Sequence, residues 1–293
     1  MVVGSGSTEL IYCFFQSLQK EKVIIPVPTY SEYEAAAVRY GFKPIFVGPC
    51  PNYGLDLNGI ETQLGKGPGA IIVCNPNNPT GRFFDKQAML ELAQLAKDTN
   101  SILFVDQAYL CFVRNQIKYS MAEFINKYPV FVLNSLSKQF GMPSLRLGWG
   151  LAARDLAEKV NEKKIPGTLS NLSIWAGEIL LEDLDFQKEM MRFLDRERTQ
   201  LFINLSKIKG IRVHPTETNF ILLELTSSST NSSKVFERLA QDGIVVRDCS
   251  RMRGLGDRFI RVTVRTKSDN AKLVLALKKA LQTAKNSDAG AEN

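Results

Sequence analysis

The chain has 293 residues, of which 44% are apolar and 23% are charged, and its formal net charge at pH 7 is +7. This composition is ordinary for a soluble globular protein, and the length accommodates one large domain and one smaller domain. No apolar run approaches membrane-spanning length, and the basic residues are interleaved with acidic ones, so we expect no membrane binding and no nucleic-acid binding.

The five cysteines are scattered along the chain without the spacing of metal ligands. Their number is odd, which does not suit a disulfide framework. We therefore expect reduced thiols, no metal site and a cytoplasmic protein.

Up to about residue 205, short β-branched runs alternate with longer helical patterns, which predicts a mainly parallel sheet wrapped by helices. The expected strands are Val23–Pro26, Pro44–Val47, Ala70–Cys74, Ile102–Val105, Val130–Leu133 and Leu147–Leu151. The expected helices are Glu9–Gln19, Tyr33–Tyr40, Lys86–Thr99, Asp155–Lys163 and a long one over Leu172–Ser206.

The pattern changes after Gly210, where a smaller α+β domain is expected. Its strands are predicted at Ile211–His214, Phe220–Glu224, Gly243–Arg247 and Phe259–Val264, and its helices at Ser233–Gln241 and Asp269–Thr283. We expect a large domain over residues 1–205, a small domain over 206–284, and a short polar tail, 285–293, that is disordered.

Polar residues follow three of the expected strands within a few positions. Asn78 lies in the turn Asn75-Pro-Asn-Asn-Pro-Thr-Gly81, Asp106 in Phe104-Val-Asp-Gln-Ala-Tyr109, and Lys138 in Ser135-Leu-Ser-Lys138. Ligands of open α/β sheets bind beyond the carboxyl ends of the strands. We therefore expect these three side chains to converge on one crevice.

A candidate anion site begins at Gly4-Ser-Gly-Ser-Thr8, which leads into an amphipathic helix. Backbone amides at a helix start, together with hydroxyl groups and an arginine fork, favour a phosphate group. The same glycine and serine residues could instead form a plain flexible linker. The candidate phosphate ligands are Gly6, Ser7, Thr8, Ser135, Ser137 and Arg146.

Lys138 and Asp106 are the candidate catalytic residues. A partly buried lysine amine that is neutral can bond to an aldehyde, and a buried aspartate can balance a positive charge. The alternatives are a surface lysine and a turn or helix-capping aspartate. The pattern Ser-x-x-Lys followed by Gly-x-x-x-x-Arg-x-Gly, over Ser135–Gly148, favours catalysis.

Together these groups supply what pyridoxal 5'-phosphate (PLP) requires of a protein. The cofactor needs a phosphate cradle, an acid for its ring nitrogen and an amine for its aldehyde. Asn78 and Tyr109 add donors for its ring hydroxyl.

The order and spacing of these motifs resemble the fold-type I enzymes of aminotransferase class I and II over nearly the whole chain. The resemblance implies an α/β, aspartate aminotransferase-like fold, with a mainly parallel seven-stranded-type sheet in the large domain. It also implies a homodimer, and it places Tyr30 where the family has an aromatic ring stacked on the cofactor.

Two members of this family are most similar, L-threonine-O-3-phosphate decarboxylase of cobalamin biosynthesis and histidinol-phosphate aminotransferase. The run from Gly243 to Arg265 resembles the decarboxylase. In that register Arg261 matches the residue that holds the substrate carboxylate, Arg247 an arginine near the substrate phosphate, and Asn171 a substrate-pocket asparagine. Arg247 could instead pair with a surface aspartate.

The chain departs from the family at two places. It begins almost at the Gly-Ser-Gly-Ser-Thr motif, where family members have a preceding segment that closes the pocket and the dimer, and Gln107 replaces a glutamate. Three hypotheses stay open. They are a decarboxylase of a phosphorylated amino acid, an aminotransferase that uses 2-oxoglutarate, and a non-catalytic module with the same fold.

Overall fold

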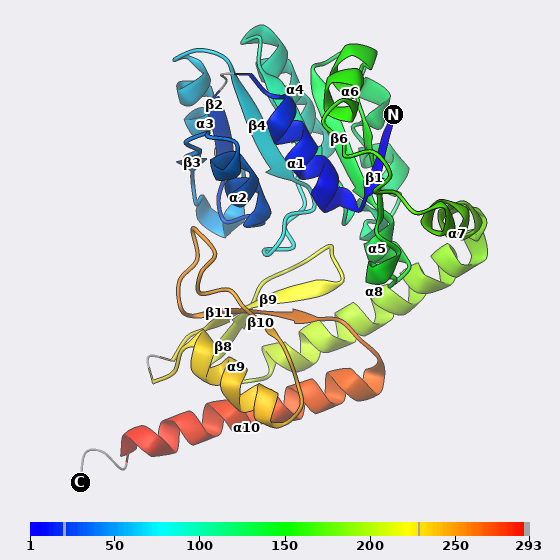
Figure 1. Cartoon of the computed structure of the whole chain (residues 1–293). Coiled ribbons are helices and arrows are strands. Elements are labelled where there is room, and N and C mark those ends of the chain that lie inside the picture. The colour runs from blue at the N-terminus through cyan, green and yellow to red at the C-terminus, as the bar shows by residue number, and fades with distance from the viewer. Residues whose placement is uncertain (20–21, 228, 290–293) are drawn as a thin grey trace.

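The computed structural model of the chain describes residues 1–19, 22–227 and 229–289, with side chains described up to Gln282. Two sheets form the molecule, and Figure 1 shows the smaller one below the larger one. Within the described residues no helix is both long enough and apolar enough to cross a membrane. All five cysteines are free thiols.

The larger sheet has seven strands in the order β1-β7-β6-β5-β4-β2-β3. The strands β2 to β6 run parallel to one another, whereas β7 runs antiparallel to both β6 and β1. This order confirms the predicted α/β fold with a mainly parallel seven-stranded sheet. The strands are β1 (Val2–Ser5), β2 (Lys22–Pro26), β3 (Ile45–Val47), β4 (Gly69–Cys74), β5 (Ile102–Asp106), β6 (Val130–Ser135) and β7 (Leu147–Leu151).

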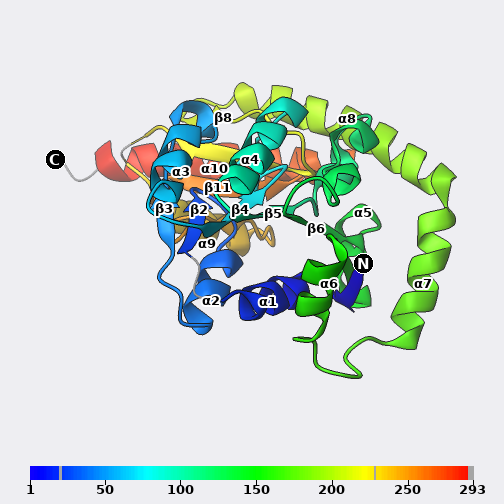
Figure 2. The ribbon, with the colours of Figure 1, turned by 90° about the horizontal axis from the view of Figure 1, so that it is seen from above.

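Helices cover both faces of this sheet, which explains why a strand such as β4 is buried at every position. Seen from above, α1 (Ser7–Ser17), α2 (Glu32–Arg39) and α6 (Arg154–Asn161) lie on one side, and α3 (Leu57–Leu64) and α4 (Lys86–Asp98) on the other (Figure 2). The short α5 (Leu136–Gln139) follows β6 directly. Single 3-10 turns occupy Pro51–Tyr53, Leu110–Phe112, Gln116–Tyr119, Ala122–Phe124 and Pro143–Leu145.

The smaller sheet is antiparallel, with strands in the order β10-β11-β9-β8. These are β8 (Ile211–Val213), β9 (Phe220–Leu225), β10 (Arg247–Asp248) and β11 (Phe259–Thr263). Its core is completed by α8 (Leu184–Ser206), α9 (Ser232–Gln241) and α10 (Lys267–Ala289). Helix α8 contributes buried residues to this core from Leu194 onward, which is before the expected boundary at residue 205. The expected domain limits, 1–205 and 206–284, stay a prediction.

Several elements differ from the sequence prediction, and β1 and α3 were not predicted. The long helix expected over Leu172–Ser206 is two helices, α7 (Asn171–Glu182) and α8, because the Asp183 carboxylate accepts a hydrogen bond from the Phe186 amide at 2.9 Å and caps α8. The strand expected at Gly243–Arg247 is reduced to Arg247–Asp248. Helix α10 extends to Ala289, whereas a disordered tail was expected over residues 285–293; residues 290–293 lie outside the described part.

Candidate active site

A cavity of about 390 Å³ lies at the carboxyl ends of the central strands of the larger sheet, where the smaller sheet faces it. The turn after β4, the last residue of β5 and the helix after β6 all open onto it, as strand-end reasoning predicts. The sequence-predicted residues that line it are Ser7, Thr8, Tyr30, Asn78, Asp106, Tyr109, Ser135, Ser137, Lys138, Arg146, Arg247 and Arg261.

Asp106 ends β5 at the floor of this cavity, and its side chain is almost wholly buried. The Tyr33 hydroxyl donates to Asp106 Oδ2 at 2.7 Å, and the Ala108 amide donates to Oδ1 at 2.9 Å. Burial raises the pKa of the Asp106 carboxyl, and these two hydrogen bonds and the Lys138 charge act against that rise. The floor therefore holds a carboxylate that has no ion-pair partner among the described residues, which suits a cationic group of a ligand.

Lys138 lies in α5, and its side chain is exposed because it extends into the open cavity. Its ammonium nitrogen lies 5.6 Å from the centre of the Tyr109 ring. The cavity walls desolvate the amine and lower its pKa, and the charges of Arg261 and Arg146 lower it further, while Asp106 acts in the opposite direction. Lys138 thus loses its proton at a lower pH than an ordinary lysine, which favours a nucleophilic amine.

The anion cradle forms where β1 meets α1. Gly6 has φ +83°, and a Cβ at this position would lie 2.3 Å from Arg146 Nη2. Only glycine therefore lets the Arg146 guanidinium approach the start of α1, next to Ser7 and Thr8. The amides at this helix start and the arginine charge together favour an anion. Gly6 does not line the cavity itself; it makes the room in which the cradle forms.

The turn after β4 is fixed by buried hydrogen bonds. Asn77 Nδ2 donates to the Pro28 carbonyl at 2.8 Å, and Asn77 Oδ1 accepts from the Thr29 hydroxyl at 2.9 Å. These bonds hold the next residue, Asn78, in the cavity wall. The Asn78 amide oxygen accepts a hydrogen bond from Arg261 Nη1, which links the two sheets across the cavity.

Two arginines on neighbouring strands of the smaller sheet line the cavity wall. Arg247 of β10 is paired with Arg261 of β11 in the strand register. The Arg261 guanidinium lies 4.6 Å from the centre of the Phe220 ring, and its Nε is buried without a hydrogen-bond partner in the described residues. Arg247 is exposed and forms no ion pair there; Asp248 accepts hydrogen bonds from Ser233 and Ser250 instead. The wall thus carries two cationic forks with free donors.

Asn171 is the one predicted ligand that lies away from the cavity. It is the exposed first residue of α7. Conversely, the sequence analysis missed Tyr33. Its spacing on an apolar helix face resembles that of any core residue, so no pattern marks it as a partner of Asp106.

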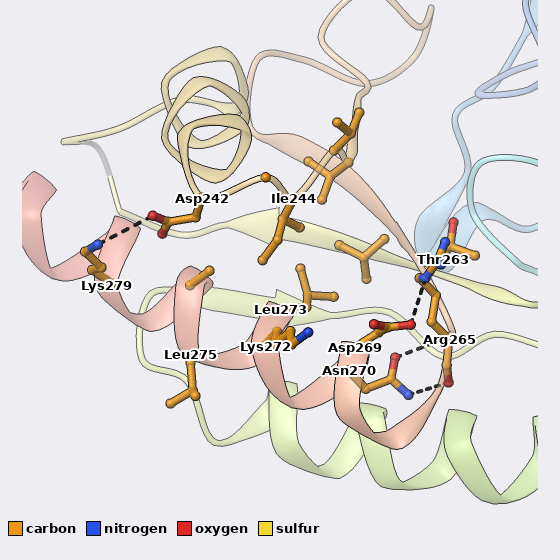
Figure 3. A pocket seen from close by; sticks show the side chains of 15 residues that line it. Asp242, Ile244, Thr263, Arg265, Asp269, Asn270, Lys272, Leu273, Leu275 and Lys279 are labelled. Atoms are coloured by element: carbon orange, nitrogen blue, oxygen red, sulfur yellow. Dashed lines mark hydrogen bonds and ion pairs between the residues drawn. The ribbon is translucent and has the colours of Figure 1, made fainter.

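A larger cavity, of about 760 Å³, lies elsewhere, between α10, β11 and the segment that follows α9 (Figure 3). Its lining is apolar in the middle, and its charged rim residues pair with one another, as Arg265 does with Asp269 and Lys279 with Asp242. It holds none of the candidate residues. In the described chain no group of histidine, cysteine, aspartate or glutamate is arranged to hold a metal ion. The smaller cavity is therefore the candidate active site.

Comparisons with known proteins agree with this geometry. Residues 1–277 match the family described as aminotransferase class I and II. The chain is 31% identical over 281 residues to a provisionally named threonine-phosphate decarboxylase of Caldanaerobacter subterraneus subsp. tengcongensis, which covers 95% of this chain and 76% of the relative. It is 33% identical over 283 residues to a histidinol-phosphate aminotransferase of Thermoanaerobacter pseudethanolicus, covering 95% and 77%.

Among solved structures, the histidinol-phosphate aminotransferase from Clostridium acetobutylicum superposes with a TM-score of 0.89 at 28% identity. The match covers 97% of this chain and 84% of that one. The fold and the family expected from the motifs are both confirmed.

Proposed function

This chain belongs to the aminotransferase class I and II family of PLP-dependent enzymes, and we propose that its substrate is an amino acid that carries both a carboxylate and a phosphate. The observation that supports this substrate class is the pair of arginines, Arg247 and Arg261, in register on β10 and β11. The reaction that we favour is decarboxylation of the threonine-phosphate type, in cobalamin biosynthesis.

The residues of the cavity fit PLP. A buried carboxylate without an ion-pair partner, Asp106, suits the ring nitrogen, and the amine of Lys138 suits the aldehyde. The space that Gly6 leaves beside Arg146 suits the phosphate. In this assignment Ser7, Thr8, Ser135 and Ser137 complete the phosphate cradle, Asn78 and Tyr109 bind the ring hydroxyl, and Tyr30 stacks on the ring.

The bound cofactor supplies an electron sink for the bond that breaks at the substrate α-carbon. The chain's own residues then have separate tasks. Asp106 holds positive charge at the ring nitrogen, and the Lys138 amine accepts and returns a proton at its Nζ. Arg261 orients the substrate by its carboxylate through two parallel charge-assisted bonds, which sets which α-carbon bond is cleaved.

Arg247 is the proposed ligand of the substrate phosphate. It lines the cavity, is exposed and forms no ion pair in the described structure, so its guanidinium donors are available. A phosphate at this position would be held beside the carboxylate-binding Arg261, because β10 and β11 align the two residues. The two forks together would select a substrate with two anionic groups.

The test of this function compares phosphothreonine with threonine in the wild type and in Arg247→Ala, with release of carbon dioxide as the measurement. We expect the wild type to prefer the phosphorylated substrate and Arg247→Ala to lose most of that preference, because the variant lacks the guanidinium that would pair with the substrate phosphate. Arg251→Ala, which removes an exposed arginine outside the cavity, is the matched control. If the wild type and Arg247→Ala preferred the phosphorylated substrate equally, Arg247 would not be the ligand of the substrate phosphate.

The second candidate function is transamination of the histidinol-phosphate type. It is supported by the relatives of that name, which match the chain over 95% of its length. The same assay distinguishes the two reactions if histidinol phosphate and 2-oxoglutarate are also supplied. Glutamate formation without release of carbon dioxide would identify the aminotransferase.

We also propose that the active form is a cytoplasmic homodimer. The support is α7, which lies at the edge of the molecule (Figure 2), packs against β7 through Gly177, and exposes Leu172, Trp175 and Ile179. Apolar side chains grouped in this way are typical of a surface that a partner covers. Light scattering is expected to give twice the chain mass, and a fully active monomer would contradict the proposal.

A further inference from the structure

The buried hydroxyl of Tyr33 has no assigned part in the proposed chemistry, although it contacts the key carboxylate. Tyr33 is in the first turn of α2, its side chain is fully buried, and its hydroxyl lies 2.7 Å from Asp106 Oδ2. Its ring meets the Tyr30 ring edge-on, with centroids 5.6 Å apart. One side chain therefore contacts both the proposed partner of the cofactor nitrogen and the proposed stacking ring.

We propose that Tyr33 is a positioning residue. Its hydroxyl fixes the Asp106 carboxylate through Oδ2 and makes this carboxylate less basic, so that a proton shared with the cofactor stays on the ring nitrogen. The inference rests on the proposed role of Asp106. The Ala108 amide holds the other oxygen, at 2.9 Å, so the carboxylate is gripped at both ends. An ionised carboxylate has about four acceptor positions, and two of these stay free for a ligand.

The sign of the effect follows from the hydrogen bond. A donor to the ionised carboxylate stabilises that form and makes the carboxylate less basic. A less basic carboxylate leaves the shared proton on the ring nitrogen, where it makes the cofactor a stronger electron sink. Without Tyr33, the proton would shift from the nitrogen toward Asp106.

Other groups also act on the carboxylate and need to stay constant in a test. They are Lys138 on α5, the Cys74 thiol on β4, and the phenols of Tyr30 and Tyr109. Tyr33→Phe removes one oxygen atom and keeps the ring that packs against Phe104. It leaves Lys138, Tyr30 and Tyr109 in place, but it also removes a hydrogen bond between the Tyr33 hydroxyl and the Cys74 thiol. Tyr12→Phe is the matched control, because it removes a tyrosine–carboxylate hydrogen bond, 3.0 Å to Glu32, without contacting Asp106.

The first measurement uses the cofactor-free protein and does not depend on turnover. Aspartate carboxyl carbons are labelled with carbon-13 and titrated by NMR, and the Asp106 signal is identified by its absence in Asp106→Asn. We expect Asp106 to titrate at higher pH in Tyr33→Phe than in wild type, and at the wild-type pH in Tyr12→Phe. An unchanged titration in Tyr33→Phe would overturn the proposal.

The second measurement uses PLP labelled with nitrogen-15 in its ring. In Tyr33→Phe the ring signal is expected to move toward that of an unprotonated pyridine, and turnover to fall by about ten-fold. If the wild type did not bind PLP, the proposed function would be wrong. The carboxyl titration of the cofactor-free protein would still show whether Tyr33 lowers the basicity of Asp106.

A third variant covers the case in which Tyr33→Phe does not fold. Replacing Tyr33 with 3-fluorotyrosine keeps the hydroxyl and makes it a stronger donor, so Asp106 is expected to titrate at lower pH than in wild type. A titration that moved to higher pH, or did not move, would overturn the proposal.

Discussion

The floor and the wall of the cavity are built differently. On the floor, formed by the larger sheet, the Asp106 carboxylate and the Asn77 amide have protein hydrogen-bond partners at both ends. On the wall, formed by the smaller sheet, Arg261 has a buried Nε without a partner and Arg247 is exposed and unpaired in the described structure. The floor is set before any ligand arrives, whereas the wall keeps donors available for one.

This difference matches the proposed division of tasks. A cofactor that stays bound needs rigid groups, because a carboxylate that is fixed in advance does not have to reorganise during the reaction. A substrate that enters and leaves needs groups that it can pair with on arrival. The buried, unpartnered Nε of Arg261 is the kind of group that a carboxylate would satisfy.

The largest effect is expected at the floor, from Lys138→Ala. Turnover should fall on the order of 10⁴-fold or more, because the amine that bonds the cofactor and moves the proton is lost. In the wild type, borohydride reduction followed by peptide mass analysis should find the cofactor on Lys138. A label on another lysine would show that the floor has been assigned to the wrong residue.

Asp106→Asn should have the next largest effect, with turnover lower by about 10²–10³-fold. Burial raises the pKa of Asp106, so its ionisation costs folding stability once the pH rises through that folded-state pKa. Asparagine does not ionise, so the cofactor-free variant should be at least as stable as wild type at neutral pH. Thermal unfolding measures this. An unchanged rate would leave Asp106 as a turn residue.

A smaller effect is expected on the pKa of Lys138, on the floor, when Arg261, on the wall, is replaced. The charge of Arg261 helps to lower the pKa of Lys138, so Arg261→Gln should raise that pKa and move deprotonation of the amine to higher pH. The pH dependence of chemical modification of Lys138 in the cofactor-free protein measures this shift. Arg265→Gln is the control, since Arg265 pairs with Asp269 outside the active site. Equal midpoints for Arg261→Gln and wild type would mean that the wall and the floor are electrostatically independent.

Sequence reasoning located the floor well because its residues follow strand ends. Asp106 is the last residue of β5, Asn78 and Lys138 follow β4 and β6 within a few residues, and the parallel strands bring such positions to one edge. Tyr33 was missed because its partner lies 73 residues away in the chain. Helical periodicity shows that Tyr33 faces the core and does not show what its hydroxyl meets there.

The differences in the elements have local causes. A single cap at Asp183 divides a continuous apolar pattern into α7 and α8, and a pattern of apolar residues does not register such a cap. Asn171 was matched to a substrate-pocket residue, yet it is the exposed first residue of α7 and does not line the cavity. The strand β1 was missed because four residues are too few to show alternation, and only pairing with β7 makes them a strand.

The Asn78–Arg261 contact joins two stretches of the gene that have different tasks. The residues proposed to hold the cofactor all precede Leu147, and the arginines proposed to select the substrate follow Gly243. Recombination or point mutation in the later stretch can therefore change which anionic substrate is accepted while Lys138 and Asp106 stay in place. A newly acquired segment would still have to supply a hydrogen-bond donor to the Asn78 amide oxygen. This requirement restricts which residues can replace Arg261 during evolution.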